Sequence, residues 1–207
     1  MRKWLLTALL AVATSATAAG LDDLKTFLNT TQTATGAFEQ KVFSRGQEEK
    51  TQAGSGEFAF LRPGCFRWQY TLPFEEEMVS DGQTLWLYDK ELEQVTVKRL
   101  MAAMPATPAS LLFGNNDFSR DFNVKNLDTD DGLAWIVATP KDEASTFTEV
   151  RIAFKSALPA KMELKDSFGQ ETCLTFDHVK KNVSMKAEDF KFVPPKGVEV
   201  LEDKTMF

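Results

Sequence analysis

The stretch LRPGCFRWQY, residues 61–70, decides the fold expected for this chain, because it joins a tight turn to an aromatic strand. Phe66, Trp68 and Tyr70 stand at alternate positions, so in an extended strand their rings share one face and the residues between them share the other. Pro63-Gly64, just ahead of them, fits the centre of a type II turn. The stretch therefore predicts a strand with one apolar face, entered through a hairpin turn.

The same pattern recurs along most of the chain as short alternating runs separated by turn residues at hairpin distances. Asp81-Gly82 is a further strong hairpin signal. Prolines 194 and 195 forbid a central strand near the end of the chain. The expected strands are residues 37–46, 54–62, 65–70, 76–82, 84–90, 93–99, 122–128, 132–140, 147–154, 160–167 and 171–179.

Helix signals are fewer and shorter. Residues 20–33 carry leucines at helical spacing and acids in the first turn. Thr107-Pro108 is a sound helix start and Gly114 a sound stop, and residues 186–190 form a short helical piece. About ten or eleven antiparallel strands in meander order, with two or three short helices, predict a mainly β protein. Its sheet must curl, and the helices can close its concave face.

The alternation also predicts which side chains face inward. Strand 84–88 is ambiguous, because both of its faces are apolar. The polar alternates (Arg67, Gln69, Glu149, Arg151, Glu163 and Lys165) suit a solvated convex side. The concave side is expected to collect Phe58, Phe60, Phe66, Trp68, Tyr70, Val150, Ile152, Met162, Leu164, Leu174 and Phe176.

The first residues have the order of a secretory signal peptide: a basic start, a short apolar run and the small residues Ala16-Thr17-Ala18. We expect cleavage after Ala18, or one residue later, and a single domain over residues 19–207. No cysteine follows the cleavage region to carry a lipid anchor, so the mature protein should be soluble. Cleavage leaves 22 basic against 30 acidic residues, a net charge of −8. This charge argues against binding nucleic acid and against tight binding to anionic lipid.

Catalytic chemistry is hard to find in the sequence. There is one histidine, His178, and no nucleophile elbow, phosphate loop, dinucleotide fingerprint or zinc-binding helix. We therefore expect no metal, no cofactor and no enzyme activity, although paired surface carboxylates leave an exported hydrolase as a weak alternative. Cys65 and Cys173 can form a disulfide in an oxidising compartment, but the sequence cannot supply their separation. Seventeen phenylalanines and seven methionines suit either an ordinary core or an adaptable apolar cavity.

Several motifs together resemble the LolA family of periplasmic outer-membrane lipoprotein carrier proteins. They occur in the family's order and spacing across essentially the whole mature chain. The matching pieces are FEQKV (38–42), LRPGCFRW (61–68), MVSDGQTLWLYDKELEQVTV (78–97), TPASLL (107–112) and FKFVPPKGVEV (190–200).

The resemblance implies an unclosed antiparallel β-barrel whose short helices form a lid over a hydrophobic cavity. It also implies a periplasmic chaperone that accepts acylated lipoproteins from an ATP-driven release complex in the inner membrane. The cargo would then pass to an outer-membrane receptor of the LolB type, through one-to-one contacts that suggest a monomer. A general carrier or sensor of fatty acids or other lipids on the same fold is the alternative.

The resemblance also assigns roles to individual residues. Arg62 matches the arginine that holds the empty lid shut by hydrogen bonds to backbone carbonyls. Phe66 matches an aromatic residue at the cavity mouth, with Trp68 deeper on the same face. The expected acyl-chain cavity comprises Phe58, Phe60, Phe66, Trp68, Tyr70, Met101, Met104, Leu111, Leu112, Phe113, Ile152, Met162 and Leu164.

Overall fold

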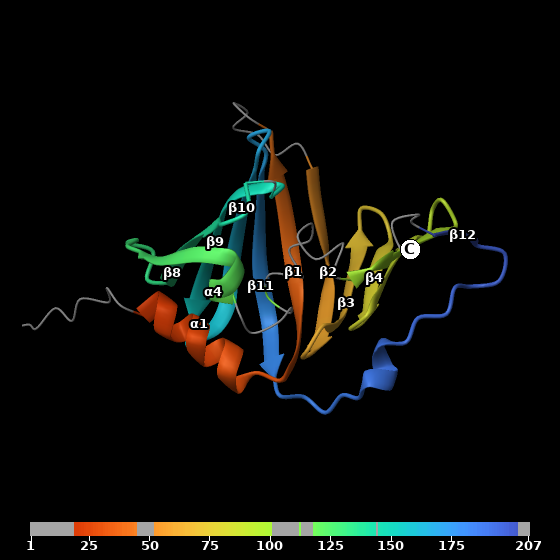
Figure 1. Ribbon diagram of the computed structural model, residues 1–207, viewed down its shortest axis with the longest axis horizontal. Coiled ribbons are helices and arrows are strands. Elements are labelled where there is room, and N and C mark those ends of the chain that lie inside the picture. Colours follow the sequence, from red (N-terminus) through yellow and green to blue (C-terminus); the bar gives the residue numbers. More distant parts are fainter. Residues whose placement is uncertain (1–18, 45–51, 101–111, 113–117, 144, 203–207) are drawn as a thin grey trace, which may run out of the picture.

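The computed structural model describes residues 19–44, 52–100, 112, 118–143 and 145–202 (Figure 1). The expected signal peptide lies outside these residues, as does the expected helix over residues 107–114 apart from Leu112. No helix in the described part of the chain is long and apolar enough to cross a membrane.

The described residues form one twelve-stranded sheet in the order β12-β6-β5-β4-β3-β2-β1-β11-β10-β9-β8-β7. Neighbouring strands are antiparallel, except that β12 runs parallel to β6. The predicted mainly β fold is confirmed, and β12 is a strand beyond the eleven expected. The strands are β1 Thr33–Phe43, β2 Gln52–Leu61, β3 Cys65–Leu72, β4 Glu76–Asp81, β5 Thr84–Asp89, β6 Gln94–Arg99, β7 Phe122–Leu127, β8 Ala134–Pro140, β9 Phe147–Lys155, β10 Leu158–Asp166, β11 Glu171–Lys181 and β12 Glu199–Glu202.

The helical elements with defined bounds in the described chain are α1 Ala19–Thr30, α4 Phe118–Asp121 and the 3₁₀ turn η2 Ala187–Phe190. Helix α1 packs on β7, β8 and β9 (Figure 1). Gly20 allows this close approach, because a Cβ atom there would lie 2.3 Å from the carbonyl oxygen of Trp135.

The sheet curls around α1. The ring centroid of Phe27 lies 6.2 Å from that of Phe60 on β2 and 6.3 Å from that of Phe154 on β9. Strands β2 and β9 are separated by three others, which in a flat sheet would place them roughly 19 Å apart. One helix side chain can touch both only because the sheet bends.

The alternation predicted the two faces correctly. All eleven side chains expected on the concave side belong to one hydrophobic cluster or pack against it. The opposite face carries ion pairs, including Arg67–Glu77 at 2.9 Å and Arg151–Glu149 at 2.8 Å. The main core therefore lies on one side of a single sheet.

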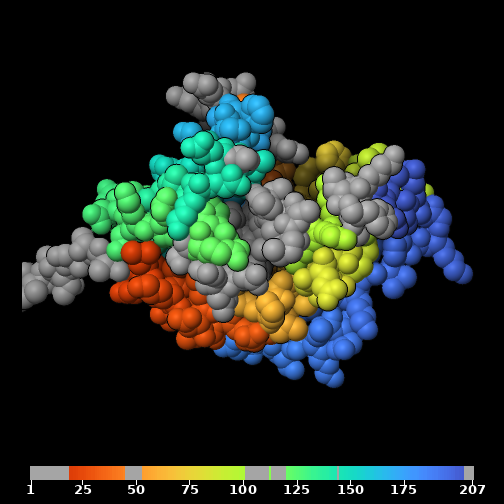
Figure 2. Space-filling model, in the orientation of Figure 1, coloured from red at the N-terminus to blue at the C-terminus, as the bar shows by residue number. Residues whose placement is uncertain are grey.

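The ambiguous strand β5 turns Leu85 and Leu87 toward the core, while Trp86 and Tyr88 lie on the other face. Phe192, in the C-terminal segment, covers both aromatic residues, with ring centroids 6.1 and 5.9 Å away. This segment runs along the lower right margin of the molecule to β12 (Figures 1 and 2). Both faces of β5 are apolar because both are covered.

The turn before β3 has a cis Arg62–Pro63 peptide bond, and Gly64 has φ +75°. A type II turn requires a positive φ at its second central residue, and Gly64 stands at that position. The hairpin itself is confirmed, because Leu61 pairs with Cys65 across it.

Candidate functional site

Arg62 is a buried cation inside the apolar core, with only 5% of its surface exposed. Its Nε donates to the carbonyl oxygen of Thr31 at 3.0 Å, and its Nη2 donates to that of Leu112 at 2.7 Å. Its guanidinium carbon lies 5.3 Å from the ring centroid of Phe27 and 5.1 Å from that of Phe60. Two carbonyl oxygens and two aromatic rings thus compensate for the lost hydration of the charge.

The position of Arg62 follows from the local chain path. Its own backbone N–H donates to the carbonyl oxygen of Gln32 at 2.9 Å, which joins the β2–β3 turn to the end of α1. Thr31 closes that helix end, so its carbonyl has no helical partner and is open to a side-chain donor. One guanidinium therefore connects α1, the β2–β3 turn and Leu112. Burial lowers the pKa of Arg62 to about 10, which leaves it charged at neutral pH.

Beside Arg62 lies an aromatic wall. The rings of Phe38 and Trp68 stack with centroids 4.0 Å apart, and Phe58 stacks on Trp68 at 5.9 Å. Phe176 meets Trp68 edge-on at 6.4 Å. Four strands, β1, β2, β3 and β11, supply these rings, so the wall exists only when the sheet has formed.

The structure brings together the described side chains expected to line the cavity. Tyr70 packs at the edge of the cluster, and its hydroxyl donates to Oε1 of Gln40 at 2.8 Å. Met101, Met104, Leu111 and Phe113 lie outside the described residues. The others are buried together, each at most 3% exposed: Phe58, Phe60, Phe66, Trp68, Leu112, Ile152, Met162 and Leu164.

Phe27 and Phe38 are two of the cluster residues that were missing from the expected cavity. Phe27 of α1 is 1% exposed and contacts both sides of the curled sheet. Phe38 of β1 is 2% exposed and stacks on Trp68. Strand alternation could have placed Phe38 on the apolar face, because it lies four residues before Val42 in the same strand and therefore on the same face. The helical leucine stripe places Phe27 beside the buried face, but nothing local shows that it lies under Arg62.

The model of the LolA family, described as outer membrane lipoprotein carrier protein LolA, matches residues 29–193. The chain belongs to the LolA family. An outer-membrane lipoprotein carrier protein of Ralstonia nicotianae is 40% identical over 201 residues, covering 95% of this chain and 94% of the relative. One from Cupriavidus pinatubonensis is 43% identical over 190 residues, covering 91% and 90%. Thus the family relation spans nearly the whole sequence.

A solved structure shows a similar fold at low sequence identity. An uncharacterized conserved protein from Thermus thermophilus superposes with a TM-score of 0.56 at 12% identity. The match covers 89% of this chain and 98% of that one. This likeness concerns the fold alone.

The two cysteines of this LolA-family chain are free thiols. Cys65 lies on β3 and Cys173 on β11, with β2 and β1 between them in the sheet. Three strand spacings are roughly 14 Å, whereas a disulfide needs Cα atoms within about 7 Å. The disulfide that the sequence left open does not form.

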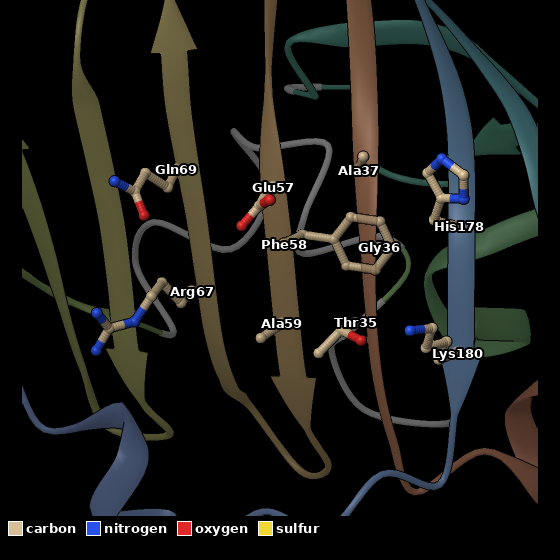
Figure 3. Close-up of a pocket in the computed structure, with 10 residues that line it drawn as sticks. All are labelled: Thr35, Gly36, Ala37, Glu57, Phe58, Ala59, Arg67, Gln69, His178 and Lys180. Carbon is tan, nitrogen blue, oxygen red and sulfur yellow. The ribbon is translucent and has the colours of Figure 1, made fainter.

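A hollow of about 330 Å³ lies on the polar face (Figure 3). The view is from the side opposite to Figure 1, so the strands run in reverse order. His178 is exposed there, with its Nε2 atom 3.5 Å from Oδ2 of Asp177. The sheet lies between this hollow and the aromatic wall, and Phe58 borders both. Its lining residues are Thr35, Gly36, Ala37, Glu57, Phe58, Ala59, Arg67, Gln69, His178 and Lys180.

Proposed function

We propose that this LolA-family chain is a periplasmic carrier that shields the acyl chains of lipoproteins and passes the cargo on without catalysing a reaction. Residues 1–18 direct export, and residues 19–207 form the carrier domain, whose first helix starts at Ala19. An ATP-driven complex in the inner membrane supplies the lipoprotein, and an outer-membrane receptor of the LolB type accepts it. The carrier works as a monomer.

The observation that carries this proposal is the buried Arg62, which joins α1, the β2–β3 turn and Leu112 at the side of an aromatic core. Burying the charge of an arginine inside a core costs free energy, so an arginine is a poor choice for fixing a turn alone. It is a suitable way to hold a segment that must open, because its hydrogen bonds can be broken and remade.

Energetics explain why a carrier needs such a latch. Burying an acyl chain contributes about 0.8 kcal/mol per methylene, so a chain of about 14 methylenes would contribute on the order of 11 kcal/mol. A carrier that retained this full amount could not release its cargo. The described wall side chains are packed against one another. Opening the core to admit acyl chains and breaking the Arg62 bonds therefore offset part of the gain.

The test compares Arg62→Leu with the wild-type chain in two steps. Leucine keeps the bulk but cannot bond the carbonyls of Thr31 and Leu112, so the empty lid loses its closing contacts. We expect the variant to accept a diacylated lipoprotein from the release complex and to retain it when the outer-membrane receptor is added. Arg67→Leu is the matched control, since Arg67 is on the polar face of the adjoining strand and should transfer cargo normally.

Normal onward transfer by Arg62→Leu would exclude the latch role. Acyl chains found by mass spectrometry in protein purified from a periplasm would identify the cargo class. Preferential extraction of free fatty acid over lipoprotein would instead favour a general lipid carrier.

A further inference from the structure

Four of the seven exposed large apolar side chains on the described surface gather at one end of the sheet. Leu72 and Phe74 flank the β3–β4 turn with 62% and 55% of their surfaces exposed, and Leu92 in the β5–β6 turn is 70% exposed. Phe168, in the β10–β11 turn of the same end, is 85% exposed. At the opposite end, around the Arg62 turn, the described residues include no exposed side chain of this class. We call Leu72, Phe74 and Leu92 the tip patch.

The two turns that carry the tip patch are joined to each other. The backbone N–H of Lys90 donates to the carbonyl oxygen of Glu75 at 3.2 Å, and their side chains form an ion pair at 2.6 Å. In the second turn, Oδ1 of Asp89 accepts from the backbone N–H groups of Glu91 and Leu92. The patch is therefore held in shape before any partner arrives, which lowers the entropic cost of docking.

Acidic residues surround the tip patch. Glu76, Glu91 and Glu93 are exposed beside it, and the nearby cation Lys90 is paired with Glu75. The edge strand β12 starts at the same turn, where the backbone N–H of Glu199 donates to the carbonyl oxygen of Glu93 at 2.9 Å. That strand adds the partly exposed Val200 and Leu201, again next to acidic residues.

The sign of these charges selects among possible occupants. An anionic lipid surface and a second copy of this acidic chain would both bring like charges together, which costs free energy. A protein surface with basic residues around an apolar groove would instead gain free energy both from opposite charges and from burial of the apolar side chains. The tip patch also lies at the end of the sheet away from Arg62, so a partner can hold it while the latch opens.

We propose that the tip patch is the docking surface for a partner protein that presents an apolar groove rimmed by lysine or arginine. This inference rests on the proposed function, in which the carrier must bind briefly to proteins that load and unload it. The acids steer the encounter, and the apolar tips set the lifetime of the complex.

The experiment measures binding of the purified chain to the purified inner-membrane release complex and, separately, to the purified outer-membrane receptor. We expect the double variant L72S/F74S to bind at least one of them about tenfold more weakly, mainly through faster dissociation. The charge variant E91K/E93K should associate more slowly and depend less on salt. F168S is the matched control, because it removes a still more exposed ring from the same end and should bind normally.

Three results would overturn the proposal: unchanged binding of both partners by the tip variants, equal loss in F168S, or no binding by the wild-type chain. So would wild-type binding to phosphatidylethanolamine–phosphatidylglycerol vesicles that L72S/F74S abolishes, since the patch would then contact lipid. Circular dichroism checks that each variant is folded. Binding of a fluorescent diacyl lipopeptide in solution, without partners, tests the proposed function separately. Its failure would leave the partner measurements interpretable.

Discussion

Gly56 shows how closely β2 approaches β3 at the base of the aromatic wall. A Cβ atom there would lie 1.8 Å from the carbonyl oxygen of Gln69 and 2.9 Å from the ring of Phe38. The backbone of β3 would have to shift to admit a methyl group, which costs free energy. We therefore expect Gly56→Ala to lower the free energy of unfolding by about 1–3 kcal/mol, as measured in urea titrations. Gly54→Ala is the control, since its nearest neighbour would be 3.2 Å away and the change should be small. Equal stability of the two variants would contradict this interpretation.

The free thiols lead to a prediction with a defined pH direction. Burial, helped by Asp81, raises the pKa of Cys65, and burial with nearby acids raises that of Cys173. The neutral thiol is therefore favoured in the folded chain. Alkylation of both cysteines should keep accelerating above pH 9.0, their ordinary pKa. Cys173 should react first because its surface is less buried than that of Cys65. Urea-unfolded chain provides the ordinary titration curve. A mass two hydrogens short, indicating a disulfide, would refute the prediction.

The burial of Arg62 could not be predicted from the sequence around it. Its position beside a turn is typical of an ordinary surface charge, and only the family motif indicated a latch. Burial between Phe27 and Phe60 depends on a helix and a strand that are distant in sequence. Alternation, by contrast, predicted Trp68 and Ile152 correctly, because it decides which side chains share a face.

Among the elements, the C-terminal segment, residues 191–198, is attached to strand β5 through Phe192. Two ring contacts of Phe192 with Trp86 and Tyr88 contribute roughly 1 kcal/mol, or about fivefold in the local opening equilibrium. Phe192→Ala should therefore speed proteolytic cleavage of residues 191–198 several-fold. Val193→Ala is the neighbouring control, since Val193 is 82% exposed. Identical cleavage rates would show that the segment is held elsewhere, for example through the hydrogen bond from Nη2 of Arg67 to the carbonyl oxygen of Asp189.

The strands themselves were predictable because turn residues and alternation are local signals. The faces of strand β5 and the existence of strand β12 were not, for the same physical reason. The two apolar faces of β5 make sense only once Phe192 is known to return across the sheet. Strand β12 pairs in parallel with β6, about a hundred residues earlier, and such a pairing leaves no signal in the alternation of either segment.

At the scale of the whole molecule, the proposed acyl-chain site exists only when the sheet has folded. Rings from β1, β2, β3 and β11 form the wall that we propose receives the acyl chains, so the unfolded chain lacks that site and cargo should stabilise the folded state. At a diacyl lipopeptide concentration about 100 times Kd, the gain is about 2.7 kcal/mol, which corresponds to a rise in Tm of roughly 5–10 °C.

The same peptide without acyl chains is the control and should leave Tm unchanged. Arg62→Leu adds a second test, because this variant lacks the hydrogen bonds to Thr31 and Leu112 that must be broken when the core opens. Opening it therefore costs less free energy. At equal lipopeptide concentration its Tm should rise by more than that of the wild-type chain, from a lower starting value. If both chains shift equally, the hydrogen bonds to Thr31 and Leu112 do not oppose loading. The cost that keeps acyl binding reversible would then come from separating the packed aromatic rings alone.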